Sequence, residues 1–109
     1  MKKVIITAII AGALGTWSLS AADAQSNWDK NCAKCHGKDG SGKTAMGKKF
    51  KLLDYTQADA QASFTDEQAA KAIKDGVEED GKTKMKPYGD ALSEQEINDL
   101  VALVRSFKK

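Results

Sequence analysis

The sequence has few of the residues on which several common kinds of protein depend. Among its 109 residues are two cysteines, one histidine and one proline. Two cysteines cannot form the several disulfides that hold many small exported domains together. The 17 basic and 15 acidic side chains nearly balance, and because nucleic-acid binding needs a clear basic excess, we expect no nucleic-acid partner. Neither a catalytic triad nor a carboxylate pair is evident, so we predict no enzyme activity.

The first 24 residues have the pattern of a secretory signal peptide. Two lysines follow the initiator methionine, an apolar run covers residues 4–14, and small residues then fit a cleavage site. A retained membrane helix needs about 20 continuous apolar residues, whereas glycine, serine and threonine interrupt this stretch. We predict cleavage after Ala24, or alternatively after Ala22, and no stable membrane insertion afterwards. Residues 25–109 would then form one small domain.

Helical patterns dominate this domain, and no alternating run of β-branched residues indicates a strand. A short helix is expected from about Asn27 into residues 32–36, and another over residues 57–62. The glycine- and lysine-rich residues 37–49 are expected to form a loop, and residues 75–90 a second, unusually long one. The fold class predicted from these patterns is all-α.

Two further helices have strong start signals. Thr65 and Gln68 form a capping box, and Gly76 suits the end of the helix that follows. Ser93 and Glu96 form a second capping box. The helix after it carries an apolar stripe made of Ile97, Leu100, Val101, Val104 and Phe107. We expect this stripe to face the core.

Both cysteines and the only histidine lie in the stretch N-C-A-K-C-H-G, between Cys32 and His36. In one interpretation, Cys32 and Cys35 attach a haem covalently and His36 binds its iron, because C-x-x-C-H is typical of c-type haem attachment. A structural zinc site would need four ligands, and the stretch offers three. A redox dithiol usually occurs in a βαβ context, which is not predicted here. The pattern favours haem, which would also supply the core that a small domain lacks.

Two methionines of the mature chain, Met46 and Met85, could bind the iron on the face opposite His36. A thioether there closes the site and raises the reduction potential, whereas an open position admits small ligands. Met46 lies in the expected glycine-rich loop, and we interpret it as a core residue. Met85 precedes Pro87, which stiffens the segment that would present the sulfur, so Met85 is the favoured ligand.

With these motifs the chain resembles the small bacterial class I c-type cytochromes over the whole of residues 25–109. The matching residues are Cys32, Cys35 and His36 of the attachment motif, Met85 of an M-x-P-[YF] loop, and the helix of residues 93–107. The resemblance implies three to four short helices around one haem c, with the N- and C-terminal helices crossing beside it. It also implies that His36 and Met85 are the iron ligands and that the haem is bound through both cysteines.

Two positions depart from the pattern of this family. Trp28 matches its aromatic position and should contact Leu100 and Leu103, but many relatives have an aromatic residue where this chain has Leu103. Relatives also place Gly-Pro where this chain has Gly47 and Lys48. A backbone carbonyl there orients the imidazole in the family, so the acceptor in this chain is left open.

The resemblance implies a soluble electron carrier of the bacterial periplasm and its respiratory chain, working as a monomer. Six lysines lie in residues 34–51 and three in residues 82–86, next to the expected ligands. We therefore expect a positive collar that docks redox partners with acidic surfaces. The alternative function is a haem-c subunit of a redox enzyme complex or a sensor that binds a small gas.

Overall fold

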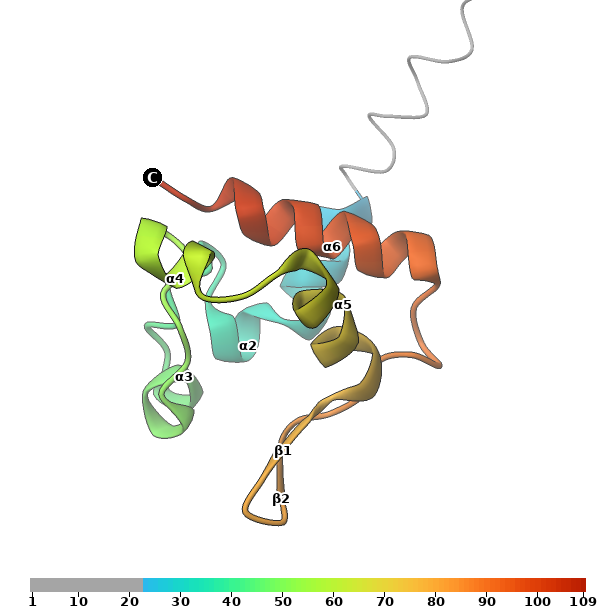
Figure 1. Cartoon of the computed structure of the whole chain (residues 1–109), viewed down its shortest axis with the longest axis horizontal. Coiled ribbons are helices and arrows are strands. Elements are labelled where there is room, and N and C mark those ends of the chain that lie inside the picture. The colour runs from blue at the N-terminus through green and yellow to red at the C-terminus, as the bar shows by residue number, and fades with distance from the viewer. Residues whose placement is uncertain (1–22) are drawn as a thin grey trace, which may run out of the picture.

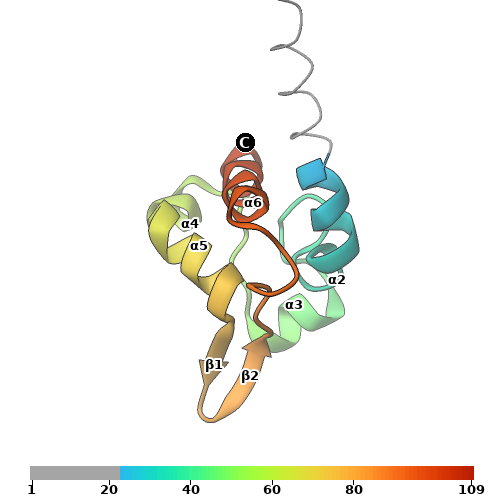
Figure 2. The same ribbon diagram turned by 90° about the vertical axis from the view of Figure 1, so that its right-hand side faces the viewer.

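The computed structural model describes residues 23–109 of the chain. Its elements are a helical segment at residues 23–31, α2 (Ala33–His36), α3 (Ala45–Phe50), α4 (Ala58–Ala62), α5 (Asp66–Asp75), β1 (Val77–Glu79), β2 (Lys82–Met85) and α6 (Glu94–Ser106). Figure 1 shows α6 passing over the N-terminal helical segment, while the β1–β2 hairpin extends away from the helices. In Figure 2, α6 lies between α4 and α5 on one side and the N-terminal segment on the other. This mostly helical arrangement confirms the predicted all-α class.

Both predicted capping boxes are present. The Thr65 hydroxyl accepts a hydrogen bond from the Gln68 amide, and the Gln68 side chain accepts one from the Thr65 amide. Ser93 and Glu96 make the same reciprocal pair at the start of α6. Each box satisfies amides that the first turn of a helix leaves without partners. Gly76 ends α5, as the sequence predicted, and α4 confirms the short helix expected at residues 57–62.

The core lies where α6, α5 and the N-terminal segment meet. Its buried members are Trp28, Cys32, Ile73, Leu92, Ile97, Leu100, Val101 and Val104. Leu100 is the most deeply buried of them, with 1% of its surface exposed. The predicted apolar stripe of the last helix therefore faces the core. Burying one such aliphatic side chain contributes about 1.5–3 kcal/mol to folding.

The expected loop at residues 37–49 was only partly correct, because α3 occupies its second half. Thr44 caps this helix, and its side-chain oxygen accepts a hydrogen bond from the Gly47 amide at 2.8 Å. Lys51 ends it in the left-handed conformation, with φ 56°. The helix was missed because a central glycine and adjacent lysines hide any apolar period, although a threonine cap was visible in the sequence.

The expected loop at residues 75–90 contains an antiparallel hairpin, so the prediction that the chain has no strand was wrong. Val77 pairs with Met85, and a bulge follows Val77. Asp80 and Gly81 turn the chain with φ of 55° and 77°. Asp-Gly is the residue pair favoured in two-residue hairpin turns, and this signal could have identified the hairpin.

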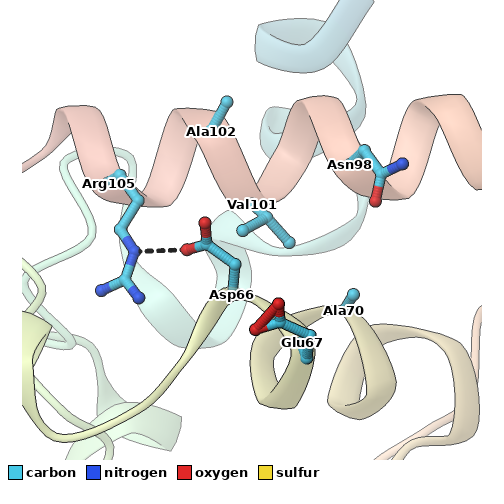
Figure 3. A pocket seen from close by; sticks show the side chains of 7 residues that line it. All are labelled: Asp66, Glu67, Ala70, Asn98, Val101, Ala102 and Arg105. Carbon is cyan, nitrogen blue, oxygen red and sulfur yellow. Dashed lines mark hydrogen bonds and ion pairs between the residues drawn. The ribbon is translucent and has the colours of Figure 1, made fainter.

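Arg105 joins α6 to the two helices beside it at one polar junction. Its guanidinium donates hydrogen bonds to the Asp66 carboxylate at 2.8 Å, to the Phe64 carbonyl at 2.9 Å and to Gln61. The guanidinium carbon also lies 4.3 Å from the centroid of the Phe64 ring. The buried Gln61 side chain donates in turn to the Val104 carbonyl at 2.8 Å. Figure 3 shows Arg105 facing Asp66 beside a groove between α5 and α6.

No helix within residues 23–109 is both long enough and apolar enough to cross a membrane. Nearly all of the predicted signal peptide, residues 1–24, lies outside the described part of the chain. Its cleavage, and the domain at residues 25–109 that it would leave, stay predictions.

Candidate functional site

The two cysteines and the histidine lie on one helical turn. The His36 amide donates to the Cys32 carbonyl at 2.9 Å, and the Cys35 amide donates to the same carbonyl at 3.2 Å. The Cys32 amide continues the preceding helix by donating to the Trp28 carbonyl at 2.8 Å. Both thiols are free. This turn therefore carries two thiols and an imidazole within five consecutive residues.

All four predicted site residues line the same cavity. A cavity of about 820 Å³ has Cys32, Cys35, His36 and Met85 in its wall. An adjoining hollow of about 210 Å³ is lined mainly by apolar side chains and also touches Cys32, His36 and Met85. Met46 is in the wall of neither cavity. The structure thus brings Met85, far along the chain, to the cysteine motif.

His36 is packed between aromatic rings. Its ring centroid lies 5.5 Å from that of Trp28 and 5.5 Å from that of Tyr55, on which it stacks. Burial lowers the pKa of His36 below its ordinary value, so the neutral imidazole that binds metal ions is favoured. Within the described residues the buried Nδ1 atom has no hydrogen-bond partner. A neutral imidazole held this way fits an axial ligand.

The carbonyls of Gly47 and Lys48, one of which would orient the imidazole in relatives, make other bonds here. The Gly47 carbonyl accepts from the Leu52 amide at 2.9 Å, and the Lys48 carbonyl accepts from the Lys51 amide at 3.4 Å. Both bonds close the C-terminal end of α3. The His36 Nδ1 atom makes no hydrogen bond with either of them, so the ring is positioned by its aromatic neighbours.

Helix α3 and the residues just before it contact the backbone of the cysteine motif. The Thr44 hydroxyl donates to the Cys35 carbonyl at 2.6 Å, and the Gly42 amide donates to the His36 carbonyl at 2.7 Å. A methyl group at Gly47 would lie 2.9 Å from the Cys35 oxygen and would overlap the Gly42 carbonyl. Only glycine allows α3 to approach this closely. Sequence reasoning named Gly47 for its carbonyl but missed its role as a contact.

The segment that carries Met85 is held against the end of α5. Met85 is half-buried at the end of β2. Beyond it, the Tyr88 amide donates to the Ile73 carbonyl at 2.9 Å. The Tyr88 hydroxyl donates to the Asn31 carbonyl at 3.1 Å, which connects this segment to the helix that leads into the cysteine motif. Tyr88 was not predicted to act in this way.

Trp28 joins the cysteine motif to the C-terminal helix. Its indole N–H donates to the Gly37 carbonyl at 2.9 Å, directly after His36. Its ring lies 5.0 Å from that of Phe107, between centroids. Leu103, the expected contact, is partly buried against the same cluster. The aromatic partner that Leu103 cannot provide is thus supplied by Phe107, one turn further along.

The two alternatives to haem find less support in this site. Burial, with a smaller contribution from Cys35, raises the pKa of Cys32 to about 11, whereas a reactive dithiol needs a lowered thiol pKa. Across residues 23–109, no three His, Cys, Asp or Glu side chains are grouped to hold a metal ion. A large cavity lined by two thiols and an imidazole, with a mainly apolar hollow beside it, instead fits a large flat cofactor attached through sulfur.

Comparisons with known proteins agree with this chemistry. Residues 20–104 match the protein family described as "Cytochrome C oxidase, cbb3-type, subunit III". The solved structure of the c-type cytochrome KustC0563 is 31% identical, with a TM-score of 0.68, and the match covers 80% of this chain and 99% of that one. A point mutant of KustC0563 matches with the same identity and TM-score over 79% and 99% of the two chains. A comparison with curated proteins gives no match. The chain therefore belongs to the family described as cbb3-type cytochrome c oxidase subunit III and is a small class I c-type cytochrome.

Proposed function

We propose that this chain is a soluble periplasmic one-electron carrier with a single haem c, held by thioether bonds to Cys32 and Cys35. His36 and Met85 would be its axial ligands. The observation that carries the proposal is the meeting of all four side chains in one cavity. When bound, the haem supplies the reversible one-electron chemistry, and the protein supplies binding and orientation.

Each of these residues has a defined task in the proposed carrier. Cys32 and Cys35 retain the cofactor in an exported protein. His36 offers a neutral nitrogen because its surroundings are apolar. Met85 offers a thioether, which closes the second face to small ligands and raises the potential. None of these tasks transfers a proton or a chemical group, so we propose no enzyme activity.

The mouth of the large cavity favours an acidic redox partner. Five lysines are in its wall, namely Lys30, Lys34, Lys51, Lys84 and Lys86. The acidic side chain among the lining residues, Glu79, is paired with Lys84 at 3.0 Å. Leu53, 44% exposed, adds an apolar contact at the same rim. Clustered positive charge of this kind steers association with acidic surfaces and makes its rate fall with salt.

One observation favours a second candidate function. The matching family is described as a subunit of a cytochrome oxidase, so the chain could serve as a haem subunit of such a complex. Washing the native membrane fraction with salt separates the two functions. Release at about 0.15 M salt, where exposed charges are already screened over about 8 Å, supports a mobile carrier. Retention at high salt supports a subunit.

The ligand set is tested by the absorption spectrum of the oxidised holoprotein. A sulfur-to-iron charge-transfer band in the near infrared is expected in the unmodified protein and in Met46→Ala. The same band should be lost in Met85→Ala, because Met85 alone of the two methionines faces the cavity. Rapid carbon monoxide binding by the unmodified reduced protein would contradict the proposal and favour a gas sensor.

A further inference from the structure

Gly76 lies in direct backbone contact with the segment that carries Met85. It ends α5 with φ 78°, a conformation that favours glycine. A methyl group at this position would lie 2.6 Å from the Met85 carbonyl oxygen, 2.9 Å from the Pro87 nitrogen and 3.0 Å from the Lys86 carbonyl carbon. These atoms all belong to the main chain, so no side-chain rotation could relieve the overlap. One of the two backbones would have to move.

The Met85 segment has little freedom to move, because α5 also holds it further along. The Tyr88 amide donates to the Ile73 carbonyl at 2.9 Å, and the Gly89 amide donates to the Lys74 carbonyl at 3.0 Å. These two bonds satisfy carbonyls that the last turn of a helix would otherwise leave unpaired. Displacing the segment to make room for a side chain at Gly76 would strain this arrangement directly beside Met85.

We propose that Gly76 is a positioning residue for the Met85 thioether. The lack of a side chain at Gly76 lets the backbone of residues 85–87 lie against the end of α5, and this contact sets where the Met85 side chain enters the cavity. The inference rests on the proposed function, in which Met85 is a ligand of the iron. It adds that a residue outside the cavity wall determines whether the ligand can bind.

The hairpin contains a control for positive φ at a glycine. Gly81, at the tip, has φ 77°, almost the same as Gly76, but a methyl group there would meet nothing within 4 Å. Gly81→Ala therefore measures the cost of a positive φ by itself. At Gly76 the ψ is −179°, and this combination of φ and ψ is open essentially to glycine alone. Gly76→Ala alone adds the overlap with the Met85 segment. The difference between the two variants therefore measures what the conformation of Gly76 and its contact with the Met85 segment require together, beyond a positive φ.

The test compares the holoproteins of Gly76→Ala, Gly81→Ala and the unmodified chain. We expect Gly76→Ala to lose most of the sulfur-to-iron charge-transfer band, to have a lower midpoint potential and to bind carbon monoxide at least about tenfold faster when reduced. Gly81→Ala should match the unmodified protein in all three measurements, although its thermal midpoint falls. A Gly76→Ala protein with an unchanged band and potential would overturn the proposal.

Two outcomes keep this inference separate from the proposed function. An unmodified protein without the band would overturn the assignment of Met85 as ligand, and the role of Gly76 with it. An unmodified protein with the band, together with an unaffected Gly76→Ala, would overturn the role of Gly76 alone. If Gly76→Ala gives too little holoprotein, both alanine variants are prepared at a lower growth temperature. The same readings then decide.

Discussion

The two sides of the cavity are built in different ways. On the His36 side, the residues that matter are neighbours in the sequence, and one helical turn, α3 and two aromatic rings surround them. On the Met85 side, one half-buried side chain lies at the end of a two-stranded hairpin, fixed by backbone contacts with α5. Local structure therefore secures the first side, whereas the second depends on tertiary contacts. We expect the Met85 side to be the first to open.

The largest effect should come from removing both sulfur bridges on the His36 side. In Cys32→Ala combined with Cys35→Ala, no thioether bond can form, so we expect a protein whose mass equals that of the polypeptide alone. Mass spectrometry of the purified, exported protein measures this. Met85→Ala is the matched variant on the other side and should keep the covalently bound haem mass. A double variant that retains this mass would contradict the attachment site.

The next effect should follow from filling the contact between α3 and the cysteine motif. A side chain at Gly47 would overlap the Gly42 carbonyl and press on the Cys35 carbonyl. We expect Gly47→Ala to lower the free energy of unfolding by about 1–3 kcal/mol, as overpacking typically does. Denaturant titration measures the change. The adjacent, exposed Lys48→Ala should differ from the unmodified protein by less than about 0.5 kcal/mol, and equal values for both variants would show that the contact is unimportant.

A smaller effect is expected from a substitution that weakens the Met85 side of the cavity. Tyr88→Phe removes the hydrogen bond from the Tyr88 hydroxyl to the Asn31 carbonyl, which is worth about 1 kcal/mol. We expect the charge-transfer band to disappear at a lower denaturant concentration, while the helical circular dichroism changes less. Asn31→Ala keeps the accepting carbonyl and should leave the band midpoint unchanged. Parallel shifts of the band and the helical signal would argue against separate opening of this side.

The smallest effect concerns the pH dependence of stability at the N-terminal cap of α6. The Ser93 amide, and after it the Asn27 side chain, lower the pKa of Glu96 below its ordinary value. A carboxyl group whose pKa is lower in the folded state than in the unfolded state stabilises the folded protein. This stabilisation is complete above the unfolded-state pKa and is lost as the pH falls through the folded-state pKa.

We therefore expect the unmodified protein to be more thermally stable than Glu96→Gln at about pH 6, with the difference shrinking towards about pH 3. Thermal melts at both pH values measure it. The charge-transfer band should be insensitive to this substitution, because Glu96 belongs to the helix cap and not to the Met85 segment. A stability difference that is constant with pH would refute the role of the carboxylate.

The same division explains what could be predicted from the sequence. The capping boxes at Thr65 and Ser93 and the motif at Cys32 are local signals, and the structure contains each as expected. The contact of Phe107 with Trp28 was missed because the family pattern places the partners of Trp28 at Leu100 and Leu103, earlier on the last helix. The role of Gly76 could not be predicted either, because a glycine after a helix is explained by the helix end itself. Only the neighbouring Met85 segment shows why nothing larger fits.

The junction around Arg105 has a consequence for the speed of the proposed carrier. Arg105 and Gln61 connect Phe64 and Val104, and these two residues form part of the wall of the smaller hollow that adjoins the cavity. A wall tied together by a guanidinium and an amide resists rearrangement when the charge beside it changes. The reorganisation free energy of each electron exchange should therefore be small, since preoriented groups need not turn at the moment of transfer.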